Sequence, residues 1–204
     1  MKSQTIRVEP LHEVQLPERR PVLKLGRWFV KEVLRMAGSH RCVVTGRNKN
    51  GQSIVVRDEK VETGLLGSAD FWRTTKSPAS LTDENAAGPV SLEPPPAGTI
   101  FRFFEIPPQD PSMSPERAEK AAAEAFAAAG ASHCRVDTRR NPMMHTTSTI
   151  DYVVVLTGRV TLLLDVGQVE LSPFDVVVQR GTNHYWLNYG TESARLMGVL
   201  LDAR

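Results

Sequence analysis

The sequence predicts a mainly β protein built around an antiparallel barrel or sandwich, with two helices added to it. Six short β-rich runs fill the C-terminal third of the chain, at residues 150–156, 160–165, 168–171, 175–179, 184–188 and 194–201. Turn-forming pairs such as Thr157-Gly158 and Arg180-Gly181 separate the runs, and no helical periodicity runs through the region. Short strands at such regular spacing are typical of antiparallel barrels and sandwiches.

Residues 1–39 are expected to form an arm and one amphipathic helix ahead of the folded body. Three prolines and the lack of periodicity indicate an irregular stretch over residues 1–21. From Val22 to Met36, apolar side chains recur at helical spacing, and a basic stripe follows the same spacing on another face. Such a helix either packs on the body or on a second subunit, or anchors the chain to an acidic partner or a membrane surface.

Residues 40–204 are expected to form a single domain, because 204 residues allow one domain with extensions. Asn50-Gly51 lies between two β-rich runs and predicts a hairpin over residues 40–57. A long loop over 63–98 is expected to hold a short strand at 70–74, and a strand is expected at 99–106. Ser114 and Pro115 open an Ala-rich run that ends at Gly130, which predicts a helix within an insertion at about 107–140. Long connections are often functional, so this insertion is a candidate lid.

Composition excludes several classes of function. The chain has 25 Lys and Arg against 23 Asp and Glu, a balance that does not favour nucleic acid as a partner. It shows neither a run of about 20 apolar residues nor a secretory leader, so we expect a cytoplasmic protein without integral membrane association. Cys42 and Cys134 form no CxxC pair and are expected to be reduced thiols. Glycine-rich phosphate motifs are absent, so no nucleotide cofactor is expected.

Polar side chains of one parity gather where the β-rich third begins. His145, Thr147 and Asp151 share a face if the chain is extended there, and His184 and Trp186 share another. On one straight strand His145 and Asp151 would lie about 20 Å apart, at about 3.3 Å per residue. Cooperation between these two side chains therefore requires a bend between them.

These residues resemble the two signature motifs of the cupin superfamily, whose members are small antiparallel β-barrels or jelly rolls with a site at the barrel mouth. HTTSTIDYVVVLTG (145–158) is similar to the first motif, and PFDVVVQRGTNHYWLN (173–188) to the second. The resemblance covers residues 99–202, and the segments RCVVTGRNKNGQSIVV and FWRTT resemble the N-terminal part of a bacterial and fungal subgroup. Phe174 stands where the family usually has glycine.

The metal motif departs from the family pattern of three His and one Glu. Thr147 replaces the second His, and Asp151 stands at the Glu position. The resemblance implies catalytic roles for His145, Asp151 and His184 and leaves three interpretations open. These side chains bind one divalent metal ion (Fe, Zn, Mn or Ni), they act without a metal as acid and base, or they are hydrogen-bonded residues of a binding protein.

The resemblance implies a small-molecule enzyme, namely a lyase, isomerase, cyclase or oxygenase acting on an organic acid, an aromatic or a polyketide-like compound. Five further residues are candidates for substrate binding: Thr147, Tyr152, Gln179, Trp186 and Arg73. The alternative is a metal-free ligand-binding or sensor protein without catalytic activity, because the fold alone does not decide function. A homodimer is the default expectation, since two-fold mates often cover sheet edges and amphipathic arms.

Overall fold

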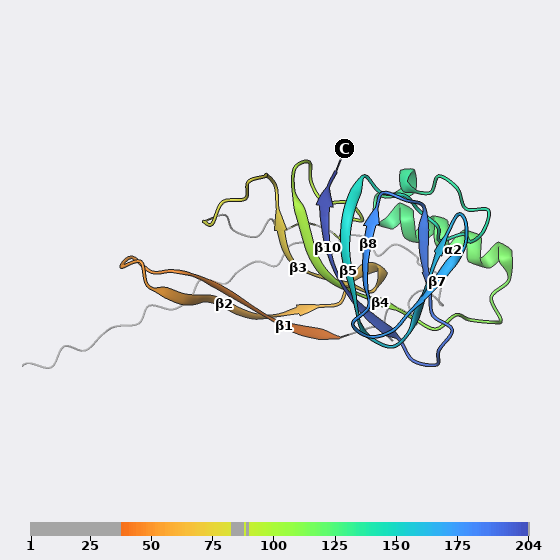
Figure 1. Ribbon diagram of the computed structural model, residues 1–204, viewed down its shortest axis with the longest axis horizontal. Helices are drawn as coiled ribbons and strands as arrows, with labels where there is room; N and C mark the ends of the chain where they lie inside the picture. The colour runs from red at the N-terminus through yellow and green to blue at the C-terminus, as the bar shows by residue number, and fades with distance from the viewer. Residues whose placement is uncertain (1–37, 83–87, 89, 204) are drawn as a thin grey trace, which may run out of the picture.

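The computed structural model describes residues 38–82, 88 and 90–203. The helix expected at 22–36 and nearly all of the expected arm lie outside these residues. Two antiparallel sheets form the body (Figure 1), one with strand order β3-β4-β10-β5-β8 and the other with order β7-β6-β9. The mainly β fold predicted from the sequence is therefore confirmed.

The elements follow the expected order along the chain. The strands are β1 (Ser39–Arg47), β2 (Ser53–Glu62), β3 (Ser68–Thr74), β4 (Thr99–Ile106), β5 (Thr149–Thr157), β6 (Val160–Leu164), β7 (Gln168–Leu171), β8 (Val176–Arg180), β9 (His184–Leu187) and β10 (Ala194–Asp202). The helices are η1 (Leu65–Gly67), α2 (Pro115–Ala128) and η2 (Ser132–Cys134). The six C-terminal strands match their predicted ranges to within one residue at each end.

Strand β5 explains why the barrel has a packed end and a polar end. Its alternate side chains point inward, and those at Val153 and Val155 pack with Leu162 and Trp186 of the smaller sheet. At the other end of the strand the same face carries Asp151, a buried residue whose side chain can ionise. Apolar side chains therefore fill one end of the barrel, while the polar residues of the first motif lie at the other.

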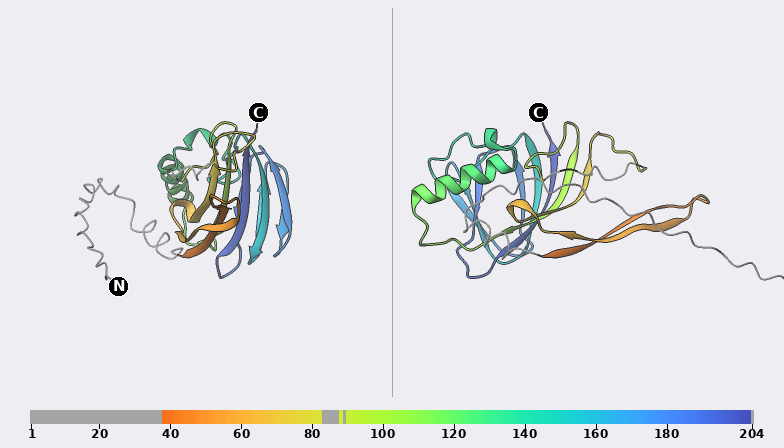
Figure 2. Two further views of the ribbon diagram at one scale, coloured as in Figure 1. Left: turned by 90° about the vertical axis from the view of Figure 1, so that its left-hand side faces the viewer. Right: turned by 180° about the vertical axis from the view of Figure 1, so that it is seen from behind.

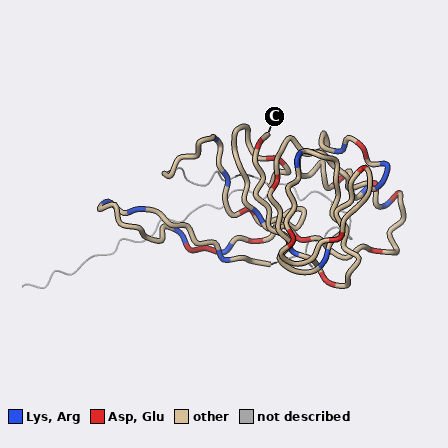
Figure 3. Tube along the Cα trace, in the orientation of Figure 1, with Lys and Arg blue, Asp and Glu red and all other residues tan. Residues whose placement is uncertain are grey.

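The hairpin of β1 and β2 extends away from the barrel (Figure 1). The two strands pair along their whole length, with an irregularity between Val44 and Thr45. Val43, Val55 and Val56 are about half exposed on it. Lys and Arg and Asp and Glu are interspersed over the barrel, while the tip of the hairpin carries basic residues (Figure 3).

Helix α2 begins where the sequence places it and packs against the barrel (Figure 2). The Ser114 hydroxyl accepts a hydrogen bond from the Arg117 amide, and Pro115 occupies the first turn. The helix buries Ala122, Ala125 and Phe126. Phe126 packs with Cys134 of η2 and with Leu66 and Leu92, so α2 forms a wall above the barrel mouth.

Several turns between consecutive strands contain a residue with positive φ, among them those at Gly158 and Phe174. Gly158 has φ 77°, and a Cβ there would lie 2.7 Å from the Cβ of Ala194, so only glycine fits. Phe174 also has a positive φ, at 73°, and the residue is 79% exposed. The departure from glycine at position 174 therefore leaves an ordinary side chain in a left-handed turn.

No helix in the described ranges is both long enough and apolar enough to cross a membrane.

Candidate functional site

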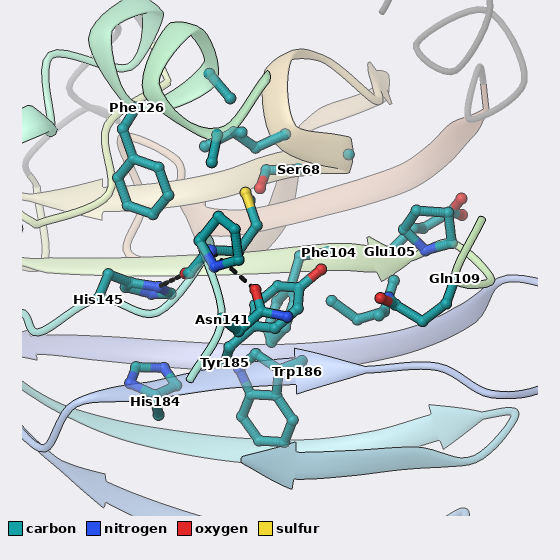
Figure 4. Close-up of a pocket in the computed structure, with 18 of the residues that line it drawn as sticks. Ser68, Phe104, Glu105, Gln109, Phe126, Asn141, His145, His184, Tyr185 and Trp186 are labelled. Atoms are coloured by element: carbon teal, nitrogen blue, oxygen red, sulfur yellow. Dashed lines mark hydrogen bonds between the residues drawn. The ribbon is translucent and has the colours of Figure 1, made fainter. Parts of the chain in front are cut away.

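A pocket of about 700 Å³ lies between α2 and the barrel mouth (Figure 4). Its walls are mostly apolar and include Leu66, Leu92, Phe104, Ile106, Pro107, Met113, Ala122, Phe126, Trp186 and Leu200. Polar side chains join them: His145, Asp151, His184, Arg102 and Tyr185, together with Ser68, Glu105, Gln109, Asp110, Asn141 and Thr191. An apolar cavity with a few convergent polar groups is the usual form of a small-molecule site.

The two histidines are brought together by a short backbone bridge outside the regular strands. The amide of each residue donates to the carbonyl of the other at 3.0 Å. The ring centroids lie 4.5 Å apart, and the ring of Phe126 lies 5.3 Å from that of His145. Figure 4 shows the two imidazoles side by side below Phe126.

Backbone carbonyls set the tautomer of both imidazoles. Nδ1 of His145 lies 3.0 Å from the Met143 carbonyl, and Nδ1 of His184 lies 2.9 Å from that of Thr182. A carbonyl oxygen only accepts, so Nδ1 carries the proton and Nε2 keeps a free lone pair. Burial lowers the pKa of His145, and burial together with the neighbouring His145 lowers the pKa of His184 to about 3. Both rings are therefore neutral at neutral pH.

Asp151 has the properties of a proton carrier. Its side chain is buried and lines the pocket, and its Oδ1 has no hydrogen-bond partner among the described residues. Burial raises the pKa of this carboxyl to about 6, against the opposing effects of the Thr149 hydroxyl and of the Arg102 charge. A carboxyl that titrates near neutral pH can both take and return a proton.

Arg102 is fixed by an ion pair at the pocket wall. Its Nη2 donates to Oδ2 of Asp70 at 3.0 Å and to the Ser91 carbonyl at 2.6 Å. Asp70 also pairs with Arg73. Asp70 and Arg102 face each other across strands β3 and β4. Nη2 of the guanidinium is therefore committed to Asp70 and Ser91, and the positive charge is held in a fixed position near Asp151.

Tyr185 adds a hydroxyl to the same pocket. Burial raises the pKa of Tyr185, and a hydrogen bond with the Gln109 side chain opposes that effect. A phenol hydroxyl can both donate and accept a hydrogen bond, so Tyr185 adds a polar group to the lining.

Sequence comparisons place this chain in a known family. It is 42% identical over 176 residues to the cupin-domain-containing oxidoreductase srdD of Neurospora crassa, covering 79% of this chain and 74% of that protein. The chain belongs to the cupin superfamily. This cupin is also 32% identical over 142 residues to phomopsin biosynthesis cluster protein C' of Diaporthe leptostromiformis, where the match covers 65% of this chain and 59% of that relative.

Solved structures and family models add little to that assignment. An RmlC-like cupin with a double-stranded β-helix fold from Methanocaldococcus jannaschii aligns with 51% of this chain and 70% of its own, at a TM-score of 0.33 and 10% identity. No protein-family model matches the chain. The family assignment therefore rests on the srdD relative.

The donor set of this cupin does not fit the metal ion that the family pattern implies. The unprotonated Nε2 atoms of His145 and His184 are suitable ligands. The Nδ1 atoms of both rings donate to backbone carbonyls, as the second ring nitrogen does in many metal sites. Among the described residues, the group of three whose ligand atoms all lie within 4.8 Å of one another is Glu93, His133 and Cys134, and not His145, Asp151 and His184. Ligands of one ion at about 2.0–2.2 Å cannot lie farther apart than about 4.4 Å. The three-residue metal site predicted from the sequence is thus not assembled.

The structure also sorts the five candidate substrate-binding residues. Trp186 lines the pocket and packs in the core, so its role in substrate binding stays a prediction. Tyr152 is 46% exposed and lies outside the lining, which corrects its predicted role as a pocket wall. Tyr152 has the opposite parity to Asp151, so the strand turns it to the outer face.

Three further candidates are polar groups buried outside the lining, so their predicted substrate contacts are corrected as well. The Gln179 amide donates to the Thr182 carbonyl at 3.0 Å and holds the turn before His184. The hydroxyl of Thr147 lies 2.7 Å from that of Thr149. Arg73 pairs with Asp70. All three act within the protein and support the segments that carry the site.

Sequence reasoning missed Arg102, Tyr185 and Phe126 as lining residues. Arg102 carried a usable signal, because an arginine on the inward parity of the apolar strand TIFRFFEI needs a buried partner. Tyr185 and Phe126 carried no comparable signal, since their places depend on how α2 and the loops fold over the barrel.

Proposed function

We propose that this cupin is a small-molecule enzyme that moves a proton at a carbon next to a carbonyl group, with Asp151 as the acid and base. The observation that carries the proposal is the state of Asp151, a buried carboxyl with a pKa of about 6 and an unpartnered oxygen in an apolar pocket. A buried carboxyl without full hydrogen bonding is costly to folding, and such groups gather at catalytic sites.

The step follows from the chemistry of the carboxyl. The ionised Asp151 takes a proton from the carbon, and the C–H electron pair moves into the adjacent carbonyl to form an enolate. The protonated Asp151 then returns the proton to the same carbon or to a neighbouring atom. Return to a different atom is an isomerisation, and loss of a neighbouring hydroxyl as water is a dehydration.

The remaining polar groups suit the enolate and its substrate. The Tyr185 hydroxyl can donate to the carbonyl oxygen, where negative charge develops. The Nε2 atoms of His145 and His184 accept hydrogen bonds, so they suit a substrate that carries a hydroxyl. The pocket thus brings these groups together with other polar lining residues, among them Glu105, Gln109, Asp110 and Asn141.

The lining favours a neutral or aromatic substrate over an organic acid. Arg102 is the only Lys or Arg side chain in the described lining, and its Nη2 already donates to Asp70 and to the Ser91 carbonyl. Phe104, Phe126 and Trp186 offer stacking surface for an aromatic or polyketide-like ring. A hydroxylated carbonyl compound of that kind matches both the polar and the apolar parts of the pocket.

The relatives favour a second candidate, an oxidation or reduction. The srdD relative is named an oxidoreductase, and the phomopsin relative is named a biosynthesis cluster protein. Both names support the proposal that this cupin acts on a small molecule. Metal-dependent oxidation in this pocket would need a third ligand beside His145 and His184, which the described geometry does not supply.

The test is exchange of carbon-bound hydrogen with solvent. The protein is incubated in D₂O with a panel of hydroxylated aromatic and polyketide-like carbonyl compounds, and mass spectrometry follows deuterium incorporation. Wild type should accelerate exchange in at least one compound, with a rate that rises with pH through about 6 as Asp151 ionises. Asp151→Asn should lower the rate at least about 100-fold, and Glu170→Gln, an exposed carboxylate on β7, is the matched control. Binding of a compound without exchange would instead support the sensor alternative.

A further inference from the structure

We propose that Glu93, His133 and Cys134 form a binding site for one borderline-soft divalent cation of the Zn²⁺ type, separate from the pocket. Nε2 of His133 lies 2.9 Å from Oε2 of Glu93 and 3.5 Å from Sγ of Cys134. The three ligand atoms all lie within 4.8 Å of one another. None of the three residues lines the pocket.

The ligand types and spacings suit this class of cation. One carboxylate, one imidazole and one thiol make an N/O/S donor set that Zn²⁺ accepts and that Mg²⁺ and Ca²⁺ do not prefer. In a tetrahedral site with Zn–S of about 2.3 Å and Zn–N of about 2.0 Å, sulfur and nitrogen lie roughly 3.5 Å apart, which is the separation found here. The nitrogen and oxygen must separate by roughly 0.4 Å to admit the ion. His133 is exposed, so water can reach the fourth position.

The surrounding structure holds two of the ligands in place. The Ser148 amide donates to Oε1 of Glu93 at 2.8 Å, which leaves Oε2 to face His133. Cys134 is 1% exposed, and its carbonyl accepts a hydrogen bond from the Thr146 amide at 2.8 Å. Supporting hydrogen bonds of this kind orient ligands in metal sites.

A cation here would join three segments around the pocket. Glu93 lies in the loop before β4, His133 and Cys134 lie in η2, and residues 146–148 connect His145 to β5. The ion would therefore stiffen the segment that separates His145 from Asp151 without touching a substrate.

Two other interpretations compete at this cluster. In one, His133 and Glu93 form a surface ion pair that needs no ion. In the other, Cys134 is a reactive thiol without a metal, but burial and the Glu93 charge raise its pKa to about 11 and oppose thiolate formation. A divalent cation would offset this effect, because it deprotonates a thiol that coordinates it. Only a metal site would use the Cys134 sulfur, the His133 imidazole and the Glu93 carboxylate together, as ligands of one ion.

The experiment titrates chelator-treated full-length protein with Co²⁺ and then with Zn²⁺. One equivalent of Co²⁺ should produce a sulfur-to-cobalt charge-transfer band and tetrahedral d–d absorption, and Zn²⁺ should displace it. Cys134→Ser should remove the charge-transfer band, and His133→Ala, which changes an exposed side chain, should weaken Co²⁺ binding at least about 10-fold. Circular dichroism confirms that each variant is folded.

Two controls separate this site from other thiols and from the pocket. Cys42→Ser removes the other cysteine, and the double variant His145→Ala/His184→Ala removes the pocket imidazoles. Both should keep the charge-transfer band. The proposal fails if folded wild type shows no such band at one equivalent, if the band survives in Cys134→Ser, or if His133→Ala binds Co²⁺ as wild type does. Loss of the band in Cys42→Ser would also overturn it.

Discussion

Replacing Asp151 by Asn should make the protein more stable at neutral pH while removing its proton carrier. The carboxyl pKa is about 6 in the folded protein against 3.8 for an unperturbed aspartate. Because the folded state binds this proton more tightly than the unfolded chain, stability is lost as pH rises from about 4 through about 6. At pH 8 the ionised Asp151 should cost about 3 kcal/mol, at about 1.4 kcal/mol per unit.

The assay is chemical denaturation of wild type, Asp151→Asn and the exposed control Glu170→Gln between pH 5 and pH 8. The free energy of unfolding of Asp151→Asn should exceed that of wild type by an amount that grows by about 1 kcal/mol over this range. The depressed pKa values of His145 and His184 act equally in all three proteins and drop out of the comparison. The reasoning is refuted if Asp151→Asn is less stable than wild type at pH 8, or if the difference does not change with pH.

Three other predictions test the packing and the assembly. Phe174→Gly should raise the free energy of unfolding by about 0.5–1 kcal/mol, because it relieves a positive φ of 73° on an exposed side chain; Phe174→Ala should not, and equal effects in denaturation would contradict this. Leu196→Ala, at a fully buried core position, should cost about 2–5 kcal/mol, and a loss below about 1 kcal/mol would show a looser core. A homodimer remains a prediction: light scattering should give twice the chain mass, and Val55→Asp on the exposed hairpin should reduce it. A monomeric wild type would contradict that expectation.

Local sequence signals were enough for the strands and for α2. Each C-terminal strand is bounded by turn residues, and α2 carries its own cap at Ser114 and its own first-turn Pro115. Such signals act over a few residues, so they can be recognised without knowing the tertiary structure. The shared parity of His145 and Asp151 can likewise be recognised from positions close together in the sequence, and both side chains line the same pocket.

The partners of the site residues depend on tertiary structure, and the sequence does not reveal them. The ion pair of Asp70 with Arg102 depends on the register of β3 against β4. The bend that brings His145 to His184 depends on a two-residue bridge rather than on a regular strand. The contact of His133 with Glu93 joins positions 40 residues apart along the chain. Tyr152 is different, because its parity opposite to Asp151 is visible in the sequence and is enough to place it on the outer face of β5, contrary to its predicted role in substrate binding.

Asp151 as proton carrier is the central claim, and its titration tests that claim most directly. Carboxyl-carbon NMR of protein labelled at aspartate, assigned by comparison with Asp151→Asn, would follow this group from pH 4 to pH 8. We expect the Asp151 resonance to titrate with a pKa of about 6. A pKa at or below the ordinary aspartate value of 3.8 would mean that Asp151 stays ionised at neutral pH, and the proposed proton transfer would have no acid to return the proton.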